Sequence, residues 1–208
     1  MQTFLPSSTL VTFNTVQASQ SESFPILNEW ADKIAKQLDN KRLFKQALEG
    51  WQILMNLTEL DPDGNYRKPA GWSSHPAVKM WRGSELLLFL YIMAMLREWK
   101  ARGFKTTLEN KVLATISQAK LQGKMGTLTP EWMRDHELFK EMASSHRQAL
   151  LAKNYEHYNQ FNWPEDTGVA PTHYDYVWPI KGGKDDTKQG TESSGKTSNQ
   201  SRLESVAV

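Results

Sequence analysis

Cysteine is absent from this chain of 208 residues. Disulfides, thiolate metal sites and cysteine nucleophiles are therefore excluded. The histidines form no HxxxH or HExxH pair, the spacings that place two metal ligands on one helix face; they are His75, His136, His146, His157 and His173. We therefore predict that the protein holds no metal and needs no cofactor.

Long apolar runs are also missing. The longest, Leu86–Leu96, has eleven residues, whereas a membrane span needs about 20. This run is typical of a buried core helix. The first ten residues, MQTFLPSSTL, have no basic region followed by a long apolar one, as a secretory signal would. We expect a cytoplasmic monomer without membrane contact.

The net charge of +2 is small, but the charge is unevenly distributed. Residues 67–124 carry eleven Lys and Arg against three Asp and Glu, a balance of +8. Residues 125–180 carry four against eight, a balance of −4. A local excess of positive charge suits a polyanionic partner such as DNA. A solvated basic face is the alternative, and charge alone does not decide between them.

The composition predicts one globular domain followed by a polar tail. The hydrophobic fraction is 39%, with eight tryptophans, which suffices for a core in a single domain over residues 1–180. Residues 181–208 have few large apolar side chains and are rich in Gly, Ser, Thr and Lys. Such a segment buries too little surface to order itself, so we expect it to be disordered.

The pattern of apolar residues predicts an all-α fold, a compact helical bundle with loop insertions. Apolar side chains recur every three or four residues, the spacing of a helix with one buried face. The segments with this pattern are 26–38, 41–60, 77–102, 107–122 and 136–153. No run alternates as a strand would. Residues 7–23 are expected to form a loop, and residues 164–179 an extended strap over the core.

The segment 41–60 also carries a polar stripe opposite its apolar one, formed by Arg42, Lys45, Gln46, Glu49, Gln52 and Asn56. Such stripes usually consist of solvated surface pairs. The alternative is a carboxylate among phosphate-binding cations, where Glu49 could move protons beside a bound nucleic acid.

Two further clusters could contact DNA. His75, Lys79 and Arg82 begin one predicted helix, where His75 could face a phosphate or cap the helix. His146, Arg147 and Lys153 lie on the last long helix and precede Tyr155 and Tyr158. Aromatic rings beside positive charge suit an unstacked base, although such rings at a helix end more often border the core.

Six segments, in order, resemble the pyrimidine-dimer DNA glycosylase or endonuclease V family, and above all its bacterial branch. They are MQTFLP, DNKRLFKQALEGWQIL, GWSSHPAVKMWRGSE, LREWKARGF, SSHRQALLAKNYEHY and YVWP. Together they extend over residues 1–6 and 38–179, which makes residues 7–37 a family-atypical insertion.

The resemblance implies DNA repair of pyrimidine dimers or related base lesions in double-stranded DNA, without a metal. In this family the N-terminal α-amine attacks the sugar C1′, and β-elimination then nicks the strand. An α-amine has a pKa of about 8, against about 10 for lysine, so more of it is unprotonated at neutral pH. By motif, the catalytic glutamate corresponds to Glu49, and the family's basic residues to Arg42, Lys45 and Arg147, with His75 as its histidine.

The sequence departs from the phage enzyme in three places. Gln2 replaces a threonine and is too bulky for easy removal of Met1, so the attacking amine belongs to Met1 or, if Met1 is trimmed, to Gln2. Leu48 replaces a phosphate-binding arginine. The insertion at residues 7–37 could displace the N-terminus from Glu49. The alternative function is therefore a DNA-binding module of the same fold whose chemistry is weakened, and a helical protein-interaction domain is a third reading.

Overall fold

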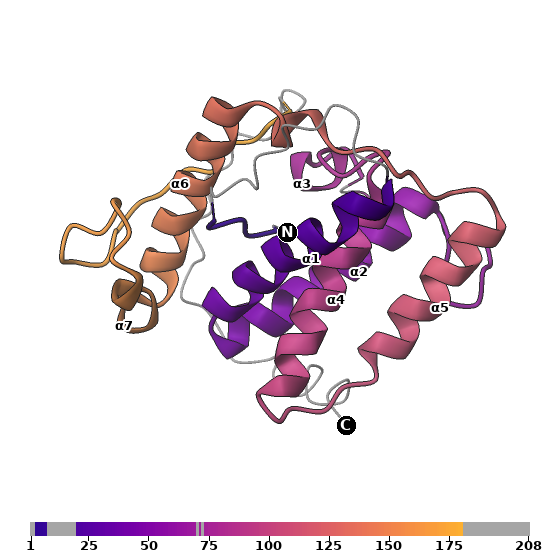
Figure 1. The fold of residues 1–208 in the computed structure, drawn as a ribbon, viewed down its shortest axis with the longest axis horizontal. Helices are drawn as coiled ribbons and strands as arrows, with labels where there is room; N and C mark the ends of the chain where they lie inside the picture. The colour runs from indigo at the N-terminus through magenta and orange to yellow at the C-terminus, as the bar shows by residue number, and fades with distance from the viewer. Residues whose placement is uncertain (1–2, 8–19, 70, 72, 181–208) are drawn as a thin grey trace.

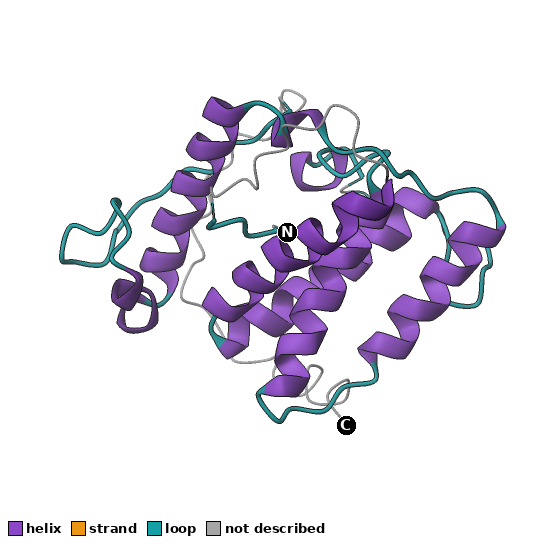
Figure 2. Ribbon diagram, in the orientation of Figure 1, coloured by secondary structure: helices purple, strands orange, loops and turns teal. Residues whose placement is uncertain are grey.

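A computed structural model describes residues 3–7, 20–69, 71 and 73–180, and of residues 20–24 only the backbone. This part of the chain is all-α, as the sequence predicts, and contains no strand (Figures 1 and 2). Its helices are α1 (Gln20–Gln37), α2 (Asn40–Thr58), α3 (Pro76–Lys79), α4 (Glu85–Ala101), α5 (Leu108–Leu121), α6 (His136–Lys153) and α7 (Tyr155–Tyr158), with 3-10 turns at Glu131–Met133 and Asn159–Phe161. The predicted tail lies outside the described residues.

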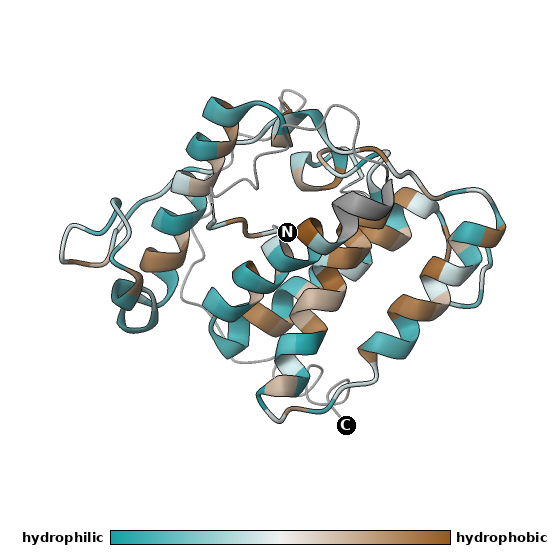
Figure 3. Cartoon of the chain, in the orientation of Figure 1, coloured by the Kyte–Doolittle hydropathy of each residue, from teal (hydrophilic) through white to brown (hydrophobic). Residues whose placement is uncertain are grey.

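Helices α1, α2 and α4 form the centre of the molecule (Figure 1). α4 packs most extensively against α2 and also against α1, while α5 contacts both α2 and α4. α4 is apolar over much of its length (Figure 3), as a helix covered on several sides must be. Gly50 of α2 lets α4 approach closely, because a Cβ at this position would lie 2.7 Å from Cγ1 of Ile92.

α6 stands apart from this central layer, and its main helix contacts are with α7 and the turn at Glu131–Met133. The N-terminal residues 3–7 lie between α6 and the central helices (Figure 1). Thr3 to Pro6 are buried although they form no regular secondary structure. The N-terminal segment therefore fills part of the space between α6 and the central helices.

The helix at 136–153 has the predicted bounds, and those at 41–60 and 107–122 lie within two residues of the prediction. Asp39 and Asp135 accept backbone N–H bonds at the first turns of α2 and α6 and so determine where these helices begin. Residues 164–179 contain no helix, and Tyr174, Tyr176, Val177 and Trp178 pack against the core, as expected of a strap.

Two predictions of the secondary structure are wrong. The segment 77–102 is not one helix, because Gly83 has a φ of +79°, which interrupts the chain between α3 and α4. The sequence Gly83-Ser84-Glu85, a glycine followed by a serine that can begin a helix, was the feature of the sequence that indicated this break. Residues 20–23 are helical rather than loop, because α1 begins at Gln20. Residues 8–19 lie outside the described part.

Candidate active site

The N-terminal segment is held against α2 by Gln46. The Phe4 amide donates to Oε1 of Gln46 at 2.7 Å, and the Gln46 side chain is fully buried. Because Gln46 and Glu49 are three residues apart on α2, their side chains leave the helix on neighbouring positions of one face. Phe4 is therefore bound to the helix face that carries Glu49.

Two other helices, α4 and α6, also bind this segment through hydrogen bonds. From α4, the Tyr91 hydroxyl donates toward the Phe4 carbonyl oxygen at 2.9 Å and lies 3.0 Å from Oε1 of Gln46. From α6, Nδ1 of His146 accepts the Leu5 amide at 3.0 Å, and Arg147 donates to the Pro6 carbonyl oxygen at 3.0 Å. We call these four side chains, Gln46, Tyr91, His146 and Arg147, the N-terminal clamp.

Thr3 is anchored separately. Its hydroxyl accepts from Nε1 of Trp81 at 3.0 Å, and the residue is fully buried. A buried Trp N–H needs a hydrogen-bond partner, and here the partner belongs to the segment that the clamp holds. Every described residue from Thr3 to Pro6 thus makes at least one hydrogen bond to a side chain of the helical body.

Glu49 lies at the edge of the buried region. Its side chain is 14% exposed, and its carboxylate is 4.0 Å from Nζ of Lys45, which is largely solvent-exposed. Burial raises the pKa of the Tyr91 hydroxyl, and the negative charge of Glu49 raises it further. The charge of Glu49 therefore acts on Tyr91 of the clamp, while its side chain remains partly exposed to solvent.

His146 and Tyr158 were expected to contact DNA, and their burial contradicts this expectation. Both are fully buried, so neither can contact a phosphate or a base in this structure. Burial, together with the positive charge of Arg147, lowers the pKa of His146 to about 3. The Tyr158 hydroxyl accepts the Asp39 amide at 3.2 Å, inside the helix packing.

Arg147 and Arg42 are paired with buried carboxylates rather than presented to solvent. Arg147 forms a bidentate pair with Glu165, with both N–O distances 2.6 Å. Arg42 pairs with Asp39 at 3.2 Å and donates to the Lys153 carbonyl oxygen at 2.8 Å. Burial alone would raise the pKa of each carboxyl, but the hydrogen bonds and the nearby guanidinium outweigh it and lower the pKa.

Lys153 and Tyr155 are half-buried and also engaged. Nζ of Lys153 donates to the Tyr174 hydroxyl at 2.7 Å, and the Tyr155 hydroxyl donates to Asp166 at 2.8 Å. The hydrogen bond to Asp166 raises the pKa of Tyr155. Among the cations predicted to contact DNA, Lys45 and Arg82 are the exposed ones, and Lys79 is half-buried.

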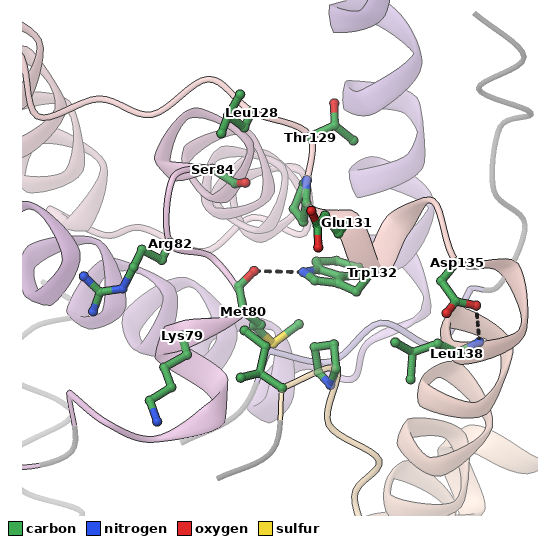
Figure 4. A pocket seen from close by; sticks show the side chains of 13 residues that line it. Lys79, Met80, Arg82, Ser84, Leu128, Thr129, Glu131, Trp132, Asp135 and Leu138 are labelled. Atoms are coloured by element: carbon green, nitrogen blue, oxygen red, sulfur yellow. Dashed lines mark hydrogen bonds between the residues drawn. The ribbon is translucent and has the colours of Figure 1, made fainter. Parts of the chain in front are cut away.

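His75 caps the short helix α3, which is one of the two roles that the sequence suggested for it. Its Nδ1 accepts the Ala77 amide at 3.1 Å, and its ring packs edge-on against Trp178. Lys79 and Arg82 follow on one side of a cavity of about 420 Å³ (Figure 4). Trp132 lines this cavity and donates its N–H to the Met80 carbonyl oxygen, and Glu131 and Asp135 bring negative charge to the lining.

Comparison with known families finds one similar family. Residues 26–112 match the family model of pyrimidine dimer DNA glycosylases. The resemblance predicted from the sequence is confirmed. Neither the comparison with curated proteins nor that with solved structures found a match.

The segment that matches the glycosylase family runs from α1 into α5 and contains both Gln46 and Glu49. It begins at residue 26, inside the stretch 7–37 that we expected to be atypical of the family; the bounds of that insertion remain a prediction. Met1 and Gln2, predicted to supply the attacking amine, lie outside the described residues.

Sequence reasoning missed two members of the candidate site. Gln46 was placed on a solvated stripe with Asn56, but both are buried, and in the described structure neither Nε2 of Gln46 nor the Asn56 amide has a hydrogen-bond partner. Tyr91 was treated as one more apolar residue of a core helix. A buried tyrosine hydroxyl needs a hydrogen-bond partner. The presence of Tyr91 within an apolar run could therefore have indicated a polar contact at this position.

Two findings concern metals and membranes. In the part of the chain that the structure describes, no three His, Asp or Glu residues are grouped so that they could hold a metal ion. None of the described helices is both long and apolar enough to cross a membrane.

Proposed function

We propose that this protein is a DNA repair glycosylase with AP-lyase activity, acting on pyrimidine dimers or related base lesions in double-stranded DNA. The family match supports a glycosylase of this class. The observation that carries the proposal for this chain is the buried N-terminal segment, whose Phe4 amide is bound one helical turn from Glu49.

The geometry suits an attack by the N-terminal amine. Three residues of chain span at most about 10 Å, so the amine of residue 1 or 2 stays within that distance of the Phe4 amide. Gln46, which binds Phe4, and Glu49 occupy neighbouring positions on one face of α2, where side chains are about 5–6 Å apart. This argument supports Met1 or Gln2 as the source of the nucleophile and Glu49 as its partner.

The chemistry needs only these two groups. The unprotonated amine attacks C1′ of the damaged nucleotide, the glycosidic bond breaks, and its electron pair leaves with the base, which takes up a proton. The sugar ring opens to a protonated Schiff base, whose positive charge the Glu49 carboxylate stabilises. The Glu49 carboxylate then takes up a C2′ proton. The electron pair of that C–H bond expels the 3′ phosphate by β-elimination, and water hydrolyses the Schiff base to free the enzyme.

Partial exposure of Glu49 fits this role. A carboxylate that is 14% exposed can face a bound sugar while much of the surrounding water is excluded, which strengthens its interaction with a developing positive charge. Lys45 beside it, and Lys79 and Arg82 at α3, would contact the DNA backbone. Arg42 and Arg147, which the resemblance assigns to DNA, pair with Asp39 and Glu165, and Lys153 donates to Tyr174. We therefore propose that these three residues stabilise the protein around the site.

Borohydride trapping tests the proposal. Reduction of the Schiff base should link the protein covalently to duplex DNA containing a pyrimidine dimer or an abasic site. Acetylation of the N-terminal amine should abolish the adduct, and the mass of the intact protein identifies the residue that carries the amine.

Glu49→Gln should leave DNA affinity largely unchanged but remove strand cleavage. Glu59→Gln is the matched control, because Glu59 is also half-buried and belongs to the C-terminal end of the same helix. Salt-dependent DNA binding without an adduct on either substrate would refute the enzyme and support a binding module; absence of binding at low salt would refute both.

A further inference from the structure

We propose that the N-terminal clamp is a positioning device for the attacking amine, and that His146 and Arg147 act on the nucleophile's segment rather than on DNA. The inference rests on the proposed function. It assigns to Gln46, Tyr91, His146 and Arg147 a role that neither the family match nor the sequence motif contains.

The first argument is how the segment is bonded. Thr3 to Pro6 belong to no helix or strand, so no neighbouring backbone determines their path. Side chains from three helices do this instead: Gln46 from α2, Tyr91 from α4, and the pair His146 and Arg147 from α6. A buried backbone amide that loses its partner costs about 1–3 kcal/mol, so these bonds select one path.

The second argument is that the clamp residues are themselves held in place. The His146 ring packs edge-on against Phe4 and Tyr176, with centroids 5.9 Å and 5.8 Å away. Arg147 is fixed by its bidentate pair with Glu165, in which both side chains are nearly buried. A side chain that orients a nucleophile should already be held in one conformation before the reaction. The packing of His146 and the ion pair of Arg147 hold these two side chains in this way.

The third argument concerns reach. Phe4 is three residues from residue 1, so the position of the Phe4 amide limits the region that the amine can occupy to a radius of about 10 Å. A displacement of about 1 Å in reacting groups can lower a rate by about 100-fold. The clamp bonds both Phe4 and Leu5 on opposite sides, to α2 and to α6, and so restrains the segment in two directions.

The test compares two substitutions of equal size. His146→Asn keeps an acceptor for the Leu5 amide, whereas His146→Leu removes it. The readouts are the single-turnover rate of adduct formation at saturating abasic duplex DNA, the dissociation constant for the same DNA, and hydrogen exchange of the Phe4 and Leu5 amides. Tyr91→Phe, which removes only the hydroxyl, repeats the test from α4.

We expect His146→Leu to lower the single-turnover rate by about 10- to 100-fold, to speed exchange of both amides, and to leave the DNA dissociation constant unchanged. His146→Asn should restore most of the rate and the protection. Thr115→Val is the control for a lost buried acceptor elsewhere, since Thr115 accepts from Trp51 away from the clamp; it should leave the rate and both amides as in the wild type.

Equal rates and equal exchange in the Leu and Asn variants would overturn the positioning role. Weaker DNA binding at an unchanged saturated rate would overturn it too, and would return His146 to the DNA interface. A wild-type protein that forms no adduct would refute the proposed function, and with it any catalytic role of the clamp, whatever the amide exchange shows.

Discussion

Acid should destabilise this protein through His146, and the effect can be worked out from the structure. His146 is fully buried and accepts the Leu5 amide at Nδ1, which requires a neutral ring. Burial and the charge of Arg147 lower its pKa to about 3 from a value near 6.5 in the unfolded chain. As the pH falls below 6.5, the unfolded chain binds a proton at this residue and the folded protein does not.

The sign follows from that difference. Stability contributed by the neutral ring is fully present above pH 6.5 and is lost as the pH falls toward 3. Each pH unit within this window costs about 1.4 kcal/mol, so the free energy of unfolding should fall by about 2 kcal/mol between pH 7 and pH 5 from His146 alone. The carboxyls of Asp39 and Glu165, whose pKa values are lowered, stay ionised over this range.

Urea denaturation at pH 7, 6 and 5 measures the effect, with His146→Asn as the comparison. The variant should be less stable at pH 7 but lack about 2 kcal/mol of the pH dependence. His173→Asn removes an exposed histidine and should keep the wild-type slope. Parallel curves for the wild type and His146→Asn would refute the reasoning, as would NMR titration of the His146 ring above pH 5.

Three other outcomes are expected. Arg147→Met should reduce the free energy of unfolding by about 3–5 kcal/mol, because it leaves the buried Glu165 carboxylate unpaired; chemical denaturation measures this, and a loss below 1 kcal/mol would contradict the pairing. Gly50→Ala should destabilise by about 1–3 kcal/mol, because the new Cβ meets Ile92. The double variant with Ile92→Ala should lose less than the sum of the two single variants; strictly additive losses would argue against this contact. Arg82→Gln should lower the slope of log K for DNA against log salt by about 1, whereas Arg42→Gln, whose guanidinium is paired with Asp39, should leave the slope unchanged; equal changes would show that both residues contact phosphate.

Local patterns in the sequence predicted most helices. The apolar spacing in 41–60 and 136–153 corresponds to the faces that α2 and α6 bury, and Asp39 and Asp135 begin these helices. These features depend on residues within a few positions of each other, which a sequence displays directly. The break at Gly83 was missed because apolar residues flank it on both sides, although residues 82–85 contain none and Gly83 adopts a positive φ.

The roles of individual polar residues were less predictable. Gln46 belongs to a polar stripe by spacing, yet it is buried because the N-terminal segment covers it. His146 and Arg147 lie beside aromatic residues in a pattern typical of DNA contact, but they bind Leu5 and Pro6, 141 positions away. Contacts over such separations leave no local pattern, and an exposed and a buried polar residue look the same in a sequence.

The sequence by itself determined the all-α class, the absence of thiol chemistry, the family resemblance and the choice of Glu49. Only the tertiary structure decided that Thr3 to Pro6 are buried against the helices, with Phe4 bound to Gln46, which precedes Glu49 by three residues on α2. The physical reason is that Thr3 to Pro6 form no regular secondary structure, so their place depends on hydrogen bonds from helices α2, α4 and α6. Those helices come together only when the chain folds.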